Sequence, residues 1–147
     1  MAGLGAAADL LSKWYACKTL VEGQPREVIP GILDWTLGYN PGIAFGIELG
    51  WWVILPAVLL GVVLVVWLFL TSDRGAVYYH IGLGLILAGA LGNLVDRLSR
   101  RGEVRDFIDF SFWPTFNVAD ALLCVGVGLV GLWILRGHRG GASEEKG

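Results

Sequence analysis

The stretch WWVILPAVLLGVVLVVWLFLT, residues 51–71, contains no charged side chain. At about 1.5 Å of rise per residue, a helix of this length covers roughly 30 Å, the thickness of the hydrocarbon core of a bilayer. The whole chain suits a membrane environment, because 55% of its 147 residues are hydrophobic and its mean hydropathy is +0.63. Residues 51–71 therefore predict a helix that crosses a membrane once.

Three other apolar stretches flank this one. Val77 to Val95 and Val118 to Leu135 are rich in glycine, and small residues at helical spacing allow helices to approach closely. Ala2 to Leu20 is interrupted by the charged residues Asp9, Lys13 and Lys18. We predict an all-α membrane protein of four transmembrane helices, with one domain over residues 1–147 and a disordered tail at residues 137–147.

Two polar, extended stretches connect the predicted spans on one side of the membrane. In the first, residues with side chains on one face alternate with residues on the other: Ile32, Asp34 and Thr36 against Leu33, Trp35 and Leu37. Alternation between turn residues predicts a strand, so we expect a small extended or β element between the first two helices. The second stretch, Gly102 to Phe116, joins the last two spans.

Two acids stand at the ends of apolar stretches. Asp96 ends one in GNLVDR, and Asp120 opens the next in FNVADALL. A carboxylate at the edge of the bilayer core is costly unless a neighbour pairs with it or a reaction uses it. Each acid is accompanied by an asparagine, Asn93 or Asn117, and four spans place both acids on the same side. The pattern indicates chemistry between two carboxyl groups.

These polar residues also have structural explanations, which the sequence leaves open. Asn117 is suited to cap the last helix, with Asp120 completing a capping box at the positive end of the helix dipole. Asp96 stands at the negative end of its helix, where pairing with Arg100 at i+4 would offset the dipole. The arginines after Asp96 are suited to anchor the helix at the interface or to bind a lipid phosphate.

Composition and spacing exclude several classes of function. The net charge is −2 and the one basic cluster is interleaved with acids, which excludes nucleic-acid binding. The two cysteines, Cys17 and Cys124, have no metal-ligand spacing, so we expect no metal site and no cofactor. Asp9 and Lys13 have the i, i+4 spacing of an intrahelical ion pair. We also expect activity to be insensitive to chelators and to serine- or thiol-directed reagents.

The chain resembles the lipoprotein signal peptidase (signal peptidase II) family, membrane aspartyl proteases that remove signal peptides from bacterial prolipoproteins after lipid attachment to their cysteine. The resemblance covers almost the whole chain and rests on motifs in the same order as in the family: Asp9-Leu10-Leu11-Ser12-Lys13, Asn40-Pro41-Gly42-Ile43-Ala44-Phe45, Gly92-Asn93-Leu94-Val95-Asp96-Arg97, Val104-Arg105-Asp106-Phe107 and Phe116-Asn117-Val118-Ala119-Asp120.

The resemblance implies a catalytic pair at Asp96 and Asp120. It places the supporting or substrate-binding residues of the family at Asp9, Lys13, Asn40, Gly89, Asn93, Arg97, Asn117 and Ala119. The implied substrate is a lipid-modified prolipoprotein that carries diacylglyceryl-cysteine, and the implied location is the bacterial cytoplasmic (inner) membrane, with the active site toward the outer face. We expect a monomer in contact with membrane lipids.

The implied mechanism is hydrolysis by two carboxyl groups that share one proton, without a metal. The helix dipoles predict that Asp96 holds the proton and that Asp120 is the base. Two departures are noted. Leu10 stands where the family has glutamine, and the side with the acids carries six Lys and Arg residues against four on the other, opposite to the positive-inside rule.

Two rival functions are considered. A small proton- or ion-coupled transporter would also use intramembrane acids but should hold them near the middle of the bilayer. A catalytically weak or inert homologue would bind lipoprotein signal sequences without cutting them. Since both acids are present at helix ends, the peptidase is the preferred interpretation.

Overall fold

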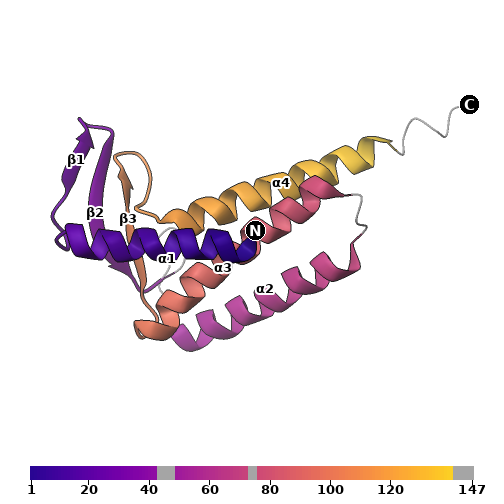
Figure 1. Cartoon of the computed structure of the whole chain (residues 1–147), viewed down its shortest axis with the longest axis horizontal. Coiled ribbons are helices and arrows are strands. Elements are labelled where there is room, and N and C mark those ends of the chain that lie inside the picture. Colours follow the sequence, from indigo (N-terminus) through magenta and orange to yellow (C-terminus); the bar gives the residue numbers. More distant parts are fainter. Residues whose placement is uncertain (43–48, 73–75, 141–147) are drawn as a thin grey trace, which may run out of the picture.

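The computed structural model describes residues 1–42, 49–72 and 76–140. It is mostly helical, with a small sheet beyond one end of the helices (Figure 1). The elements are α1 (Ala2–Thr19), β1 (Arg26–Ile29), β2 (Leu33–Asn40), α2 (Trp51–Thr71), α3 (Val77–Ser99), β3 (Val104–Phe110) and α4 (Val118–Gly140). Helix α3 contacts each of the other three helices, so it forms the centre of the bundle.

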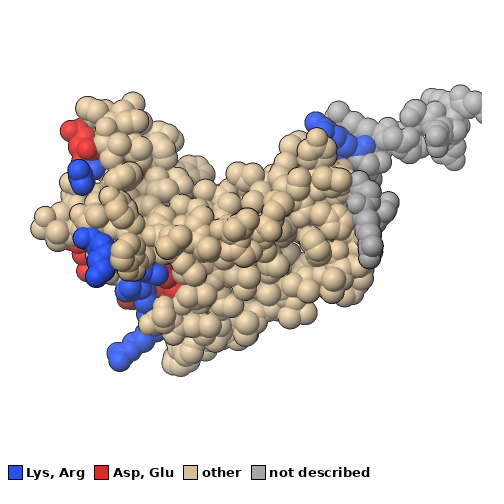
Figure 2. Space-filling view, in the orientation of Figure 1, with Lys and Arg blue, Asp and Glu red and all other residues tan. Residues whose placement is uncertain are grey.

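Three helices in the described part of the chain are long and apolar enough to cross a membrane: Trp51–Thr71, Val77–Ser99 and Val118–Arg136. Figure 2 shows that charged side chains gather around the sheet end, with a smaller group at the opposite end and a broad uncharged region between them. In α1, Asp9 and Lys13 are buried, whereas its exposed large hydrophobic side chains include Leu4, Leu11, Trp14 and Tyr15. Two charges of α1 therefore face protein, and the third, Lys18, is exposed near the end of the helix.

The sheet contains three antiparallel strands in the order β1-β2-β3. The predicted extended element is confirmed by β2, but β3 comes from the second polar stretch and pairs along β2. Opposite residues include Asn40 with Val104 and Gly38 with Asp106, after a shift of register beyond Trp35. The pairing therefore brings the two loops together and places Asp106 beside the end of β2.

The helix ends differ slightly from the sequence prediction. Helix α3 continues past Val95 to Ser99, so Asp96 and Arg97 lie within its last turns. Helix α4 begins at Val118, as expected, but it includes residues 137–140, which we had expected to be disordered. The remainder of that predicted tail, residues 141–147, lies outside the described residues.

Glycines bring α3 and α4 into close contact, as predicted. A Cβ atom at Gly82 would lie 2.9 Å from the carbonyl oxygen of Gly126, and a Cβ atom at Gly126 would lie 2.7 Å from that of Gly82. Nearer the sheet, a Cβ atom at Gly89 would overlap the carbonyl oxygen of Ala119. Small residues are therefore required where the two helices cross.

Candidate active site

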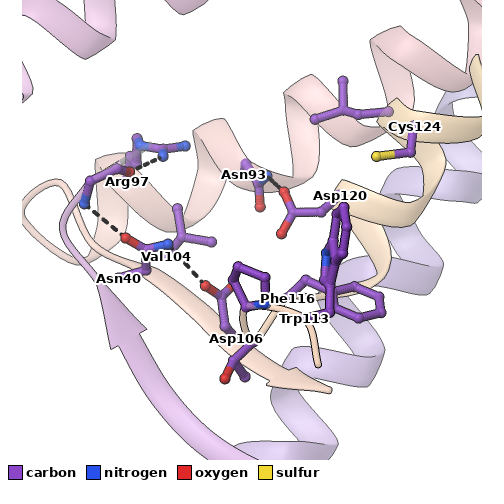
Figure 3. A pocket seen from close by; sticks show the side chains of 13 residues that line it. Asn40, Asn93, Arg97, Val104, Asp106, Trp113, Phe116, Asp120 and Cys124 are labelled. Atoms are coloured by element: carbon purple, nitrogen blue, oxygen red, sulfur yellow. Dashed lines mark hydrogen bonds between the residues drawn. The ribbon is translucent and has the colours of Figure 1, made fainter. Parts of the chain in front are cut away.

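A cavity of about 270 Å³ lies where the sheet meets the adjacent ends of α3 and α4. Figure 3 shows side chains from β2, β3, α3 and α4 around it. Four predicted site residues line it: Asn40, Asn93, Arg97 and Asp120. The second acid in the lining is Asp106 of β3, not Asp96.

Asp106 is a buried carboxyl group held by two asparagines. Its side chain is 4% exposed, and it accepts hydrogen bonds from Nδ2 of Asn40 (3.1 Å) and Nδ2 of Asn117 (2.6 Å). Burial raises the pKa of Asp106 to about 6, and the neighbouring charge of Asp120 adds to the increase, while the two asparagines and Lys13 oppose it. Asp106 therefore holds a proton at higher pH than an ordinary aspartate.

Asp120 both caps α4 and faces the cavity. Its backbone N–H donates to Oδ1 of Asn117 (3.0 Å), and the backbone N–H of Asn117 donates to Oδ2 of Asp120 (3.3 Å). This reciprocal pair is the predicted capping box. The other oxygen, Oδ1, accepts from Nδ2 of Asn93 at 2.8 Å (Figure 3). Capping therefore orients the carboxylate and leaves it in the cavity.

Asp96, which the sequence analysis expected to pair with Asp120, does not line this cavity. It is fully buried and accepts from the backbone N–H of Arg105 (3.1 Å) and from Nε of Arg105 (3.1 and 3.2 Å to its two oxygens). Nη2 of Arg105 also contacts Oδ1, and Nζ of Lys13 lies 3.5 Å from Oδ2. Two cations enclose the carboxylate, so it anchors the chain rather than facing substrate.

The turn after α3 explains this arrangement. Arg101 (φ 55°) and Gly102 (φ 103°) take up left-handed conformations, which reverse the chain so that Arg105 folds back over the end of α3. A carboxylate at a helix C-terminus is disfavoured by the dipole, and a buried one needs a cation. Arg105 supplies it in place of the expected Arg100, whose guanidinium lies 5.5 Å from the centre of the Tyr39 ring.

A second buried ion pair joins α1 to the site. Nζ of Lys13 lies 2.8 Å from Oδ2 of Asp9, as the i, i+4 spacing predicted. Oδ1 of Asp9 accepts from the backbone N–H of Ala119 at 2.8 Å. A Cβ atom at Gly92 would overlap Oδ2 of Asp9, so glycine is required there. The ion pair therefore fixes α1 against the start of α4.

Arg97 joins α3 to the loop after β2. Its Nη2 donates to the carbonyl oxygen of Gly42 at 2.9 Å, and the backbone N–H of Gly42 donates to Oδ1 of Asn40 at 2.9 Å. Arg97 is 8% exposed and lines the cavity. The remainder of that sequence motif, residues 43–45, lies outside the described residues.

The sequence analysis gave no role at this site to two ionisable residues that line the cavity, Asp106 and Cys124. Asp106 and Arg105 lie in a motif that was recognised, but the acid at the end of a helix was preferred to the acid in a loop. Cys124 lies one helical turn after Asp120 and lines the cavity, which helical spacing from Asp120 could have indicated. Among the described residues, no group of three or more His, Cys, Asp or Glu side chains could hold a metal ion.

Comparison with known proteins gives matches over most of the chain. A family model described as Signal peptidase (SPase) II matches residues 1–136. The lipoprotein signal peptidase of Coxiella burnetii (strain Dugway 5J108-111) is 45% identical over 137 residues, which are 86% of this chain and 82% of that protein. The lipoprotein signal peptidase of Mycobacterium avium (strain 104) is 42% identical over 120 residues, 78% of this chain and 65% of that protein.

A solved bacterial membrane enzyme, determined by the in meso method at 2.3 Å resolution, superposes with a TM-score of 0.86. It is 30% identical in sequence, and the match covers 99% of this chain and 88% of that chain. A second bacterial membrane enzyme, at 1.9 Å resolution, gives a TM-score of 0.82 at 33% identity, over 91% of this chain and 89% of that chain. The chain therefore belongs to the signal peptidase II family.

Proposed function

We propose that this membrane protein is an aspartyl endopeptidase that removes the signal peptide from lipid-modified bacterial prolipoproteins, with Asp106 and Asp120 as its catalytic pair. The observation that carries the proposal is the meeting of these two carboxyl groups at one cavity, where each raises the cost of ionising the other. In this proposal Asp96, which pairs with Lys13 and Arg105, stabilises the fold and takes no part in the reaction.

The roles of the two acids follow from their surroundings. Asp120 accepts hydrogen bonds from Asn93 and from the backbone of Asn117, which orient its carboxylate in the cavity. It takes a proton from water, whose oxygen attacks the scissile carbonyl carbon. Asp106, protonated, gives its proton to the carbonyl oxygen. When the tetrahedral intermediate collapses, Asp120 gives the leaving amine the proton that it took from water, and Asp106 takes back a proton from the intermediate's hydroxyl group. Asp106 takes the role that the sequence had assigned to Asp96.

The membrane arrangement extends the same proposal. Helix α1 is the fourth span in this proposal, because Asp9 and Lys13 face the protein and the exposed charge, Lys18, lies in the last turn of the helix. The cavity lies at the sheet end, which we place at the outer face of the bacterial inner membrane. The cavity contains both acids of the proposed pair, so this proposal requires no second copy of the chain and takes the protein to act as a monomer. The diacylglyceryl group of the substrate cysteine lies against membrane lipid beside the cavity.

Cleavage by single-residue variants tests the catalytic pair. The purified protein is incubated in detergent with a lipid-modified prolipoprotein, and the freed signal peptide is quantified per folded molecule. We expect Asp106→Asn and Asp120→Asn to reduce cleavage by at least three orders of magnitude, since an acid–base pair acts as a unit. Asp109→Asn is the matched control, because Asp109 lies in the same strand, opposite Asp34 of β2.

Asp96→Asn distinguishes the two possible pairs. This variant removes the anion that Arg105 and Lys13 hold, so we expect less folded protein but measurable cleavage by each folded molecule. Full activity in Asp106→Asn together with none in folded Asp96→Asn would restore Asp96 as the catalytic acid. Binding of the prolipoprotein without cleavage by the parent protein would indicate an inert homologue.

A further inference from the structure

Lys13 is a fully buried cation whose ammonium group reaches beyond its ion-pair partner on α1. Besides Oδ2 of Asp9, its Nζ lies 2.8 Å from Oδ1 of Asn93 on α3. Asn93 is 7% exposed and lines the cavity. Lys13 itself is absent from the cavity's lining, so it acts on the site only through Asn93 and the neighbouring acids.

The amide group of Asn93 has two distinguishable ends. Its oxygen accepts from Nζ of Lys13 and, at 3.2 Å, from Nδ2 of Asn117, while its nitrogen donates to Oδ1 of Asp120. An amide oxygen only accepts hydrogen bonds and an amide nitrogen only donates them. A cationic donor at the oxygen therefore makes the reversed amide unfavourable, because reversal would point N–H groups at Lys13 and an oxygen at the carboxylate of Asp120.

We propose that Lys13 is a positioning residue for the reaction: it fixes the orientation of the Asn93 amide, which in turn holds the carboxylate of Asp120 toward the water that attacks the substrate. The path runs from α1 through α3 to α4 in two hydrogen bonds of 2.8 Å each. Without the Lys13 donor, the Asn93 amide is held at its oxygen only by the longer bond from Asn117 and can reverse.

The competing explanation is that Lys13 only neutralises Asp9 and Asp96. A double variant separates the two explanations. In Asp9→Asn/Lys13→Met the ion pair is removed as a unit, and the amide oxygen of the new asparagine can still accept from the backbone N–H of Ala119. If Lys13 were only the counter-ion of Asp9, this neutral pair would restore the activity that Lys13→Met loses, because Arg105 still pairs with Asp96. If Lys13 orients Asn93, the double variant stays impaired.

Kinetics on the lipid-modified prolipoprotein provide the first measurement, and this step rests on the proposed function. We expect kcat per folded molecule to fall by ten- to a hundredfold in Lys13→Met and in the double variant, with KM within about twofold, because misplacing a catalytic group affects the chemical step. Lys18→Met, the same change at an exposed lysine of the same helix, should match the parent. Restored kcat in the double variant would overturn the proposal.

A second measurement does not depend on cleavage. The chain contains three asparagines, Asn40, Asn93 and Asn117, so protein labelled with ¹⁵N only at asparagine side chains gives three pairs of amide signals. The Asn93 pair is assigned by its loss in Asn93→Ala. We expect one Asn93 proton to exchange slowly in the parent and in Lys18→Met, and to exchange at least tenfold faster in Lys13→Met and in the double variant.

The two measurements fail independently. If the parent does not cleave the prolipoprotein, the proposed function fails, while the exchange of the Asn93 protons still decides whether Lys13 orients the amide. Unchanged Asn93 signals in the folded double variant would overturn the positioning role whatever the parent cleaves.

Discussion

At the scale of single residues, the raised pKa of Asp106 links the chemistry of the site to the stability of the fold. The difference between its pKa of about 6 and the ordinary value of 3.8 corresponds to roughly 3 kcal/mol. The folded protein binds this proton more tightly than the unfolded chain does, so the contribution of Asp106 to stability falls as pH rises from about 4 to about 6 and stays low above it. The protein therefore keeps an acid where ionisation destabilises the fold.

The same pKa predicts the pH dependence of the reaction. Because the pair needs one proton on Asp106, we expect kcat/KM to fall as pH rises above about 6, by up to tenfold for each further pH unit. The profile is measured from pH 5 to pH 9 on the lipid-modified prolipoprotein, with the fold checked by circular dichroism at each pH. A flat profile between pH 6 and pH 9 would contradict the assignment of the acid.

Cys124 changes the expectation that thiol reagents have no effect. It is exposed and lines the cavity one turn after Asp120, whereas Cys17 is half-buried at the far side of Arg105. We expect N-ethylmaleimide to abolish most of the cleavage by the parent and by Cys17→Ala, because the adduct occupies the cavity. Cys124→Ala should keep most of its cleavage in the presence of the reagent. Equal inhibition of the parent and Cys124→Ala would contradict this.

Residue roles were harder to predict than residue positions. Motif order identified Asn40, Asn93, Asn117 and Asp120 correctly as neighbours, since all contact one another or Asp106 in the structure. It could not decide between Asp96 and Asp106, because that choice depends on where Arg105 goes. The backbone reversal at Arg101 and Gly102 determines the position of Arg105. The hydrophobic pattern of the sequence does not encode this local conformation.

At the scale of elements, helix spans were predictable and strand pairing was not. The apolar stretch at residues 51–71 predicted both ends of α2 correctly, because the thickness of a bilayer limits the length of a span. The sheet depends instead on the pairing of β2 with β3, two strands separated by the 63 residues 41–103. Alternation indicated the first strand but carried no information about its partner.

The packing of α1 against α3 makes a further prediction. Gly92→Ala would place a Cβ atom against Oδ2 of Asp9, which Lys13 and Ala119 hold in place, so the helices have to separate. We expect a loss of stability of about 1–3 kcal/mol, as overpacking usually gives. The measurement is the thermal midpoint of the detergent-solubilised protein.

Gly128→Ala is the matched control for that variant. A Cβ atom at Gly128 of α4 would meet nothing within 4 Å, and alanine favours a helix over glycine. We expect its thermal midpoint to equal or slightly exceed that of the parent. A midpoint for Gly92→Ala within error of the control would show that α1 packs less closely on α3 than described.

At the scale of the whole molecule, the position of the cavity predicts a requirement for lipid on the substrate. The exposed aromatic side chain of Trp113 lines the cavity, and together with exposed Phe112 it lines an adjoining apolar pocket that also contacts Asp120. Burying four methylene groups of an acyl chain contributes about 3 kcal/mol, or roughly a hundredfold in binding. We expect kcat/KM to be at least a hundredfold higher for the lipidated precursor. Equal turnover of both precursors would contradict this.

The buried charges of α1 also constrain how the protein is made. Asp9 and Lys13 leave the ribosome long before Asn93 and Ala119, the residues of α3 and α4 that accept or donate their hydrogen bonds. A charged pair facing lipid without these partners is costly, so α1 is a poor span by itself. In the proposed four-span arrangement, stable insertion of α1 therefore awaits synthesis of the start of α4, where Ala119 supplies the partner of Asp9.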